Sequence, residues 1–120
     1  MSPDEFRTVK VRLHFPTGAK PPRHARLRIR VEDVSGADRE STVIAEGTPE
    51  PLGGGDSAIQ VSVPAGLIDP RSSYSVFIHV DADGSGRITA GDFISPAVHP
   101  VLTRGAPDAI EAKLIRVGGS

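Results

Sequence analysis

Two short segments near the start of the chain alternate strictly between apolar and polar residues. In VKVRLHF (residues 9–15) every odd position is apolar, and in RLRIRV (residues 26–31) three arginines alternate with three aliphatic residues. A β-strand points successive side chains to opposite faces, whereas a helix cannot divide these residues into two faces. The alternation therefore predicts half-buried strands in both segments.

Turn-forming residues separate five further segments with strand character. Thirteen glycines and 11 prolines among 120 residues suit short strands and turns better than long helices. Residues 47–57 are a predicted loop, and residues 64–70 a connection with room for one helical turn. The predicted strands are 42–45, 59–63, a central strand at 74–80, an edge or irregular strand near 94–103 that contains two prolines, and 110–117.

Seven short strands joined by frequent turns predict an all-β fold. We expect a seven-stranded antiparallel Greek-key β-sandwich of the immunoglobulin or transthyretin kind, with a small barrel as the alternative. The length allows one domain over residues 1–120, ordered from about 6 to 117, with a frayed tail at 118–120. The predicted core is Val9, Val11, Leu13, Leu27, Ile29, Val31, Ile59, Val61, Val63, Val76, Ile78, Ile110 and Leu114.

The segment DADGSGRITAGD (residues 81–92) matches the spacing of a calcium-binding loop. Calcium takes about six to eight oxygen ligands, and such a loop supplies them at alternate positions. Gly86 stands at the sharp turn, and Ile88 is expected to anchor the loop to the core; position 12 is Asp, where Glu is usual. The alternative is a hairpin turn whose carboxylates accept hydrogen bonds from backbone amides, and the sequence leaves both open. The predicted calcium ligands are Asp81, Asp83, Ser85, the carbonyl of Arg87, Thr89 and Asp92.

Basic side chains follow the polar faces of the first two predicted strands. If these strands pair, five cations line one outer sheet face and can receive an acidic protein partner. The alternative is a solvated face that discourages aggregation. No aromatic residue alternates with the cations to stack on bases, so we expect no nucleic-acid binding. The five residues are Lys10, Arg12, Arg26, Arg28 and Arg30.

Several function classes find no support in the residues present. The chain has no cysteine, which excludes disulfides, thiolate metal sites and cysteine nucleophiles. No nucleophile elbow or other recognisable triad setting appears, so we expect no enzyme. No apolar run is long enough to span a bilayer. We expect a cytoplasmic protein as the sequence is given, and a periplasmic or outer-membrane-associated one if a leader was removed.

Five short motifs occur in a familiar order: VEDVS (31–35), VSVP (61–64), YSVFIHVD (74–81), GDF (91–93) and PVLT (100–103). Over residues 6 to 117 or so, the chain resembles the YscW/YbaY family of small lipoproteins. The namesake of that family is the pilotin, or lipoprotein chaperone, of type III secretion. The resemblance implies a compact β-sandwich that binds another protein and has no catalytic role, although the leader and the lipid-bearing cysteine of the family are absent.

The residues and the resemblance together predict a non-catalytic protein-binding or chaperone-like module. A calcium-dependent carbohydrate- or ligand-binding domain is the alternative. A shallow groove with an exposed aromatic residue beside residues 81–92 would favour the alternative, whereas a smooth sheet face or an open edge strand would favour protein binding.

Overall fold

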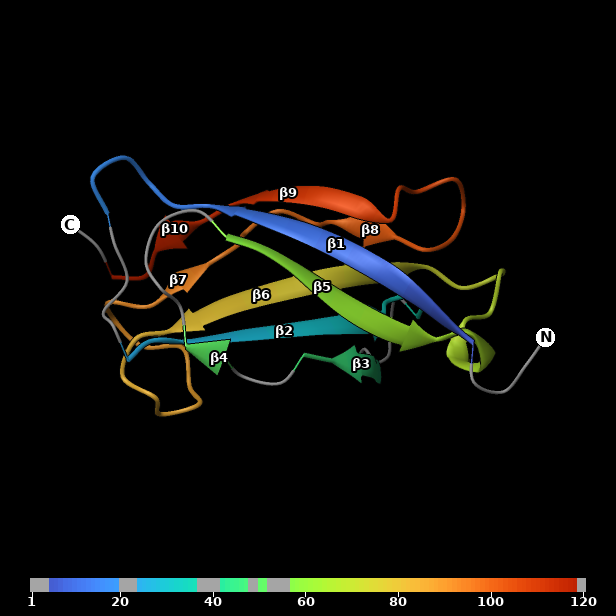
Figure 1. The fold of residues 1–120 in the computed structure, drawn as a ribbon, viewed down its shortest axis with the longest axis horizontal. Coiled ribbons are helices and arrows are strands. Elements are labelled where there is room, and N and C mark those ends of the chain that lie inside the picture. The colour runs from blue at the N-terminus through green and yellow to red at the C-terminus, as the bar shows by residue number, and fades with distance from the viewer. Residues whose placement is uncertain (1–4, 20–23, 37–41, 48–49, 52–56, 119–120) are drawn as a thin grey trace.

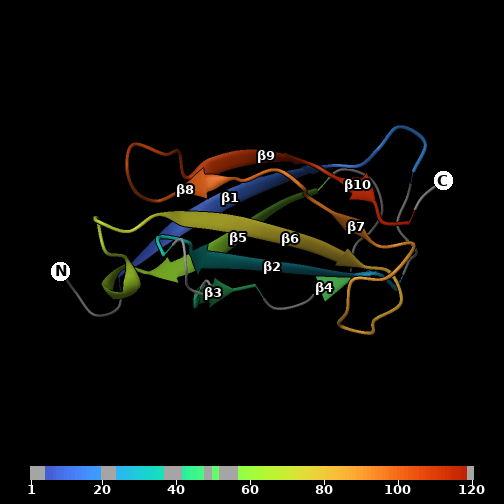
Figure 2. The same cartoon turned by 180° about the vertical axis from the view of Figure 1, so that it is seen from behind.

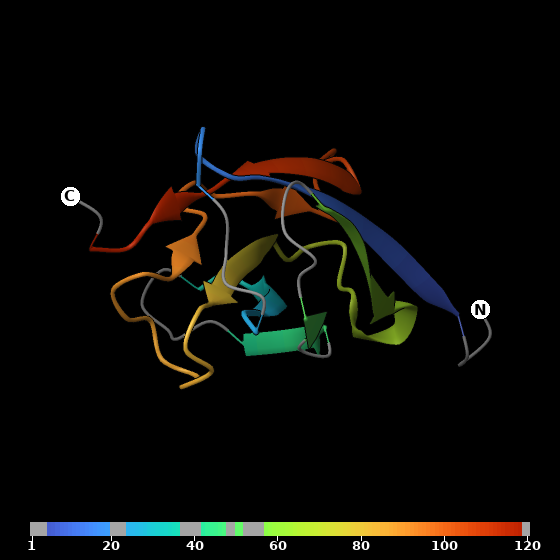
Figure 3. The same ribbon diagram turned by 60° about the vertical axis from the view of Figure 1, so that its left-hand side comes forward.

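Two β-sheets packed face to face make up the described part of the chain (Figure 1). The structure is a computed structural model and describes residues 5–19, 24–36, 42–47, 50–51 and 57–118. Much of the predicted loop at 47–57 and of the predicted tail at 118–120 lies outside these residues. Because the sheets form separate layers, as the turned view of Figure 3 shows, the prediction of an all-β fold with two sheets is confirmed, whereas the seven-strand count and the Greek-key order are not.

The smaller sheet has three strands, β5 (Ser57–Pro64), β1 (Phe6–His14) and β9 (Ala109–Lys113), in that order. β1 pairs antiparallel with β5 and parallel with β9. The prediction of an entirely antiparallel fold is therefore wrong. Before it returns as β9, the chain forms strands of the other sheet. Such a crossover connection allows β9 to run in the same direction as β1, which a hairpin connection does not.

The larger sheet, which faces the viewer in Figure 2, is built around the long strands β2 and β6. Its order is β10, β7, β6, β2, β3, with β4 also paired to β2 and β8 also paired to β6. The predicted strand near 94–103 is instead two strands of two residues each, because proline removes ladder donors from this segment. The strands are β2 (Arg26–Asp33), β3 (Thr42–Glu46), β4 (Glu50–Pro51), β6 (Tyr74–Asp81), β7 (Phe93–Ile94), β8 (Pro100–Val101) and β10 (Ile115–Arg116).

The core lies between the two sheets and matches the predicted set closely. Of the predicted residues, Ile59 and Ile110 are partly buried against the core, and all the others are buried. Burying one such aliphatic side chain stabilises the fold by about 1.5–3 kcal/mol. The core also takes in residues outside the predicted set: Ala25, Tyr74, Val80, Phe93, Val101, Leu102 and Ala112.

One short helix accompanies the strands in the described residues. It is η1 (Ala65–Leu67), a single 3₁₀ turn in the segment where the sequence left room for one. The Tyr74 hydroxyl closes this connection, since it accepts a hydrogen bond from the amide of Asp69 (2.8 Å) and donates to the carbonyl of Leu67 (3.3 Å). No helix of the described segments has the length and apolar character needed to cross a membrane.

Candidate functional site

A groove of about 410 Å³ lies on the outer face of the larger sheet. Its floor comes from neighbouring strands: Arg28 on β2 stands opposite His79 on β6, and Arg30 stands opposite Phe77. The strand period of two places these four side chains on the face turned away from the core. The rest of the lining is Glu46, Ile78, Gly86, Ile88, Ile94 and Ser95.

Apolar side chains are exposed along this groove. Phe77 is 38% exposed in the middle of β6, and Ile88 is 59% exposed on the loop between β6 and β7. Ile94 on β7 lies partly buried beside them. Because the larger sheet already has a complete core on its other face, these side chains contribute little to folding, and clustered exposed apolar residues are typical of a binding surface.

The loop between β6 and β7, residues 82–92, begins from a buried carboxylate. Asp81 is 0% exposed and accepts hydrogen bonds from the amides of Gly84 (3.0 Å) and Gly86 (2.8 Å). The guanidinium of Arg28 donates to the same carboxylate at 3.0 Å, which links the loop to the groove floor. Gly86 has φ +80°, a left-handed conformation that glycine adopts without strain.

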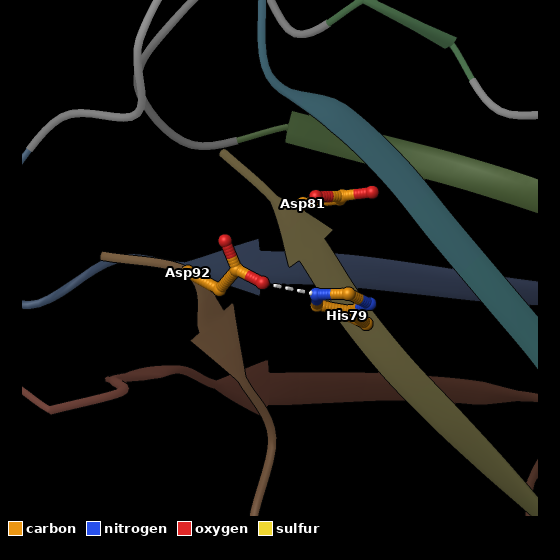
Figure 4. A group of neighbouring side chains, drawn as sticks. All are labelled: His79, Asp81 and Asp92. Atoms are coloured by element: carbon orange, nitrogen blue, oxygen red, sulfur yellow. Dashed lines mark hydrogen bonds and ion pairs between the residues drawn. The ribbon is translucent and has the colours of Figure 1, made fainter. Parts of the chain in front are cut away.

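A second buried carboxylate, Asp92, holds the other end of the loop (Figure 4). One oxygen accepts from the amide of Ala82 (2.8 Å), and the other accepts from the amide of Thr89 (3.0 Å) and lies 2.6 Å from Nε2 of His79. Burial on its own would raise the pKa of Asp92, but these hydrogen bonds, that of His79 first, outweigh it and hold the pKa below its usual value.

Asp83 is exposed and closes the middle of the loop. Its carboxylate accepts from the amide of Ser85 and from the hydroxyl of Thr89, both at 3.0 Å. The hydrogen bonds from Ser85, with a smaller contribution from Thr89, hold the pKa of Asp83 well below its usual value. The three aspartates together fix the loop through backbone amides, which is the arrangement expected of the hairpin-turn interpretation.

The predicted anchoring role of Ile88 is wrong. Its side chain is 59% exposed and lines the groove rather than the core. The hydrogen bonds of Asp81 and Asp92 already fix the loop, so no apolar anchor is needed, and the isoleucine is left on the surface.

The predicted calcium ligands contact one another and one residue outside the predicted set. Asp81 and Asp92 come together, but with His79, and within the described residues this is the one trio of His, Cys, Asp or Glu whose ligand atoms all lie within 4.8 Å of one another. Asp83 stays outside that trio and is bound to Thr89, while the carbonyl of Arg87 accepts from the hydroxyl of Ser85 at 3.3 Å.

The five predicted cations lie on two different sheets, so the prediction of one continuous basic face is wrong. β1 pairs with β5 and β9, not with β2, which puts Lys10 and Arg12 on the outer face of the smaller sheet. There they line a separate hollow of about 390 Å³ with Glu111. Arg26, Arg28 and Arg30 share the larger sheet as expected, and Arg30 lies 3.1 Å from the buried carboxylate of Glu32.

A serine of the groove lining contacts a histidine in the segment between β7 and β8. Ser95 Oγ lies 2.5 Å from Nε2 of His99, and the amide of His99 donates to the hydroxyl of Ser75 at 3.2 Å. Burial lowers the pKa of His99, because the charged imidazolium loses hydration there. Through its contacts with Ser95 and Ser75, His99 braces the irregular segment between β7 and β8.

One sequence feature indicated the groove, although the alternation pattern did not identify it. Phe77 belongs to a strand segment that is apolar on both faces, a pattern that favours a central position in a sheet. β6 is indeed central, but Phe77 is exposed on its outer face. An apolar residue out of phase with the buried positions Val76, Ile78 and Val80 is therefore the mark of the groove in the sequence.

A family model matches residues 5–114 of the chain, and its description is type III secretion system lipoprotein chaperone, YscW. The chain belongs to the YscW family. The description of the family names a chaperone and not an enzyme. No curated protein matches this YscW-family chain.

A solved structure shares the fold of this YscW-family chain. It is described as an alternative pilotin from the type II secretion system of Vibrio cholerae. The two chains are 24% identical and align with a TM-score of 0.75, over 96% of this chain and 100% of the other. The expected β-sandwich of the family is thus confirmed by the fold as well as by the sequence.

Proposed function

We propose that this YscW-family domain is a non-catalytic chaperone-like module that holds a segment of a protein partner in the groove of the larger sheet. The observation that carries the proposal is the exposure of Phe77 and Ile88, which both line one groove. A groove of about 410 Å³ accommodates a few side chains of a partner chain and not a whole domain surface. The partner is a component of a secretion system, as the family description suggests.

The charges of the groove favour a partner segment that carries negative charge. Arg30 is 49% exposed and Arg28 35% exposed, so both present donors to the groove although each also contacts a buried carboxylate. Apolar side chains of the partner would pack on Phe77 and Ile88, and acidic ones would face the arginines. Such charges at a rim raise the association rate and set orientation more than they add affinity.

The alternative of a calcium-dependent carbohydrate- or ligand-binding domain has one observation in its favour. An exposed aromatic ring, Phe77, does lie in a groove that the loop helps to line. Against it, the rest of the apolar lining is aliphatic, from Ile88 and Ile94, and the family description names a chaperone. These observations favour a peptide segment over a sugar.

Calcium binding by residues 81–92 stays a prediction, and the hydrogen bonds of Asp81, Asp83 and Asp92 weigh toward the turn instead. Thermal melts in about 10 mM calcium, magnesium or chelator test it. A calcium-specific rise in Tm that Asp83→Ala abolishes would support the metal site. Asp83 suits this test because it is exposed, so its removal should leave the fold intact. Equal Tm values in calcium and chelator would contradict the calcium prediction.

The family description also bears on the compartment. Because the family is one of lipoproteins, we propose a periplasmic or outer-membrane-associated location over the cytoplasmic one. Fractionation of the source cell, with an antibody against this domain, tests that proposal. Recovery with cytoplasmic markers alone would contradict it.

Site-specific photocrosslinking in the source cell tests the groove. A benzoylphenylalanine at position 77 or 88 should crosslink one protein, and mass spectrometry should identify it as a secretion-system component. Ser62 offers the matched control, because it is exposed on the outer face of the smaller sheet. Crosslinks from position 62 alone, or from none of the three positions, would show that the groove is not the docking surface.

A further inference from the structure

β9 is an edge strand whose outer side is open. It ends the order β5, β1, β9, and among the described residues no strand pairs with its other side. In Figures 1 and 2 it lies along the upper margin of the molecule with no strand beyond it. An open edge presents amides and carbonyls that a further strand can use.

The register with β1 fixes which backbone groups face outward. The amide of Lys10 donates to the carbonyl of Asp108, and the amide of Leu114 donates to the carbonyl of His14. In a parallel pair, alternate residues of a strand bond to its partner, so the even residues of β9 point their backbone groups toward β1. The amides and carbonyls of Ala109, Glu111 and Lys113 therefore point away from the molecule.

Few registers allow β9 to pair with a second copy of itself in the antiparallel sense. Residues whose backbone groups point away from the molecule must pair with the same kind of residue in the other copy. Any other register would set exposed side chains opposite buried ones. A two-fold axis at Glu111 or at Lys113 then puts identical charges face to face, which is unfavourable. An axis at Ala112 instead sets Glu111 of each copy opposite Lys113 of the other, and Ile110 opposite Leu114.

We propose that this YscW-family domain self-associates through β9, in an antiparallel pair centred on Ala112. Glu111 and Lys113 are both exposed on the outer face, with the Glu111 side chain 72% exposed, so each is available to the other copy. Ile110 and Leu114 face the core side, so the apolar layer continues from one copy into the next. The two three-stranded sheets thus become one continuous sheet, on a surface separate from the groove.

Sedimentation velocity of the purified chain, from about 10 µM to about 1 mM, tests the dimer. The natural chain should shift from monomer to dimer over this range. Glu111→Lys and Lys113→Glu should each weaken association about tenfold or more, because each sets two like-charge pairs across the axis. The double variant E111K/K113E restores opposite charges and should dimerise again, and so should an equimolar mixture of the two single variants.

Two control variants separate this surface from general effects. Gln60→Lys adds a charge to the outer face of the same sheet away from the β9 edge and should leave association unchanged. Glu111→Gln removes the negative charge without creating a like-charge pair, and should weaken the dimer less than Glu111→Lys. Circular dichroism checks that every variant is folded. A natural chain that stays monomeric to the highest concentration, or single reversals that dimerise as the natural chain does, would overturn the proposal.

Discussion

Asp81 places a carboxylate in the interior of a protein that has few polar groups there. Its side chain is 0% exposed, and three donors reach its two oxygens: the amides of Gly84 and Gly86 and the guanidinium of Arg28. Burying such a group costs several kcal/mol unless its partners replace the lost hydration. The donors on the loop therefore stabilise the fold as well as shaping the groove.

Replacing Asp81 tests this balance. Asp81→Ala leaves the Arg28 guanidinium and two loop amides without their acceptor, and should lower the free energy of unfolding by about 3–5 kcal/mol. Urea unfolding at neutral pH measures the loss. Asp83→Ala is the matched control, because Asp83 is an exposed aspartate of the same loop, and it should change the unfolding free energy little. Equal losses for the two variants would mean that burial of the carboxylate is not what matters.

At the scale of the element, hydrogen bonds hold both ends of the loop between β6 and β7, and an apolar side chain of the loop lines the groove. Asp81 and Asp92 hold its two ends through backbone amides, whereas Ile88 is exposed. A side chain held in place before binding loses little entropy when a partner packs on it. The loop is thus suited to offer a preformed apolar contact.

Ile88→Ser should separate binding from stability. Because the side chain is exposed, its loss should change the free energy of unfolding by no more than about 0.5 kcal/mol. Leu13→Ala in β1, where the side chain is fully buried, should cost about 2–5 kcal/mol by the same urea measurement. The crosslink from position 77 should meanwhile weaken in the Ile88→Ser background. A stability loss near that of Leu13→Ala would restore the anchoring role of Ile88.

The strands were predictable from the sequence to the extent that alternation reports burial. Val9, Val11, Leu27 and Ile29 were placed correctly because an apolar residue at every second position has one simple explanation, a buried face. Alternation is silent about which strand lies next to which. Lys10 was therefore grouped with the arginines of β2, although the two strands belong to different sheets.

The groove was harder to predict than the core for a related reason. Phe77 and Ile88 are apolar and exposed, which breaks the rule that the prediction relied on. Residues that break such local rules are expected at functional sites. The loop spacing singled out Asp81, Asp83 and Asp92 as oxygen ligands, but it could not show that loop amides would engage all three carboxylates or that His79 would contact Asp92.

At the scale of the whole molecule, Asp92 makes stability depend on pH. Burial would raise the pKa of this carboxyl, but the hydrogen bonds of His79, Thr89 and Ala82 hold it below its usual value. The unfolded chain, in which an aspartate titrates near pH 3.9 or so, therefore takes up the proton more readily than the folded chain. The stabilisation is present above that pH and is lost as the pH falls through the pKa of the folded state.

Urea unfolding at neutral pH and at several values below about pH 4 should show this loss. Asp92→Asn should be less stable than the natural chain at neutral pH and should lose less stability on acidification, because one of the protons that drives acid unfolding is gone. Parallel pH profiles for the two proteins would show that Asp92 does not couple folding to pH.

The parallel pairing of β1 with β9 has a consequence for the order in which the molecule can form. Arg7 and Asp108, which form an ion pair beside these strands, stand 101 residues apart. During synthesis β1 can find β5 early, but its other edge has no partner until β9 has also been synthesised. Contacts so distant along the chain slow folding, toward milliseconds to seconds for β-rich domains. Until β9 arrives, the nascent sandwich carries one open edge on β1 and is most exposed to misassociation.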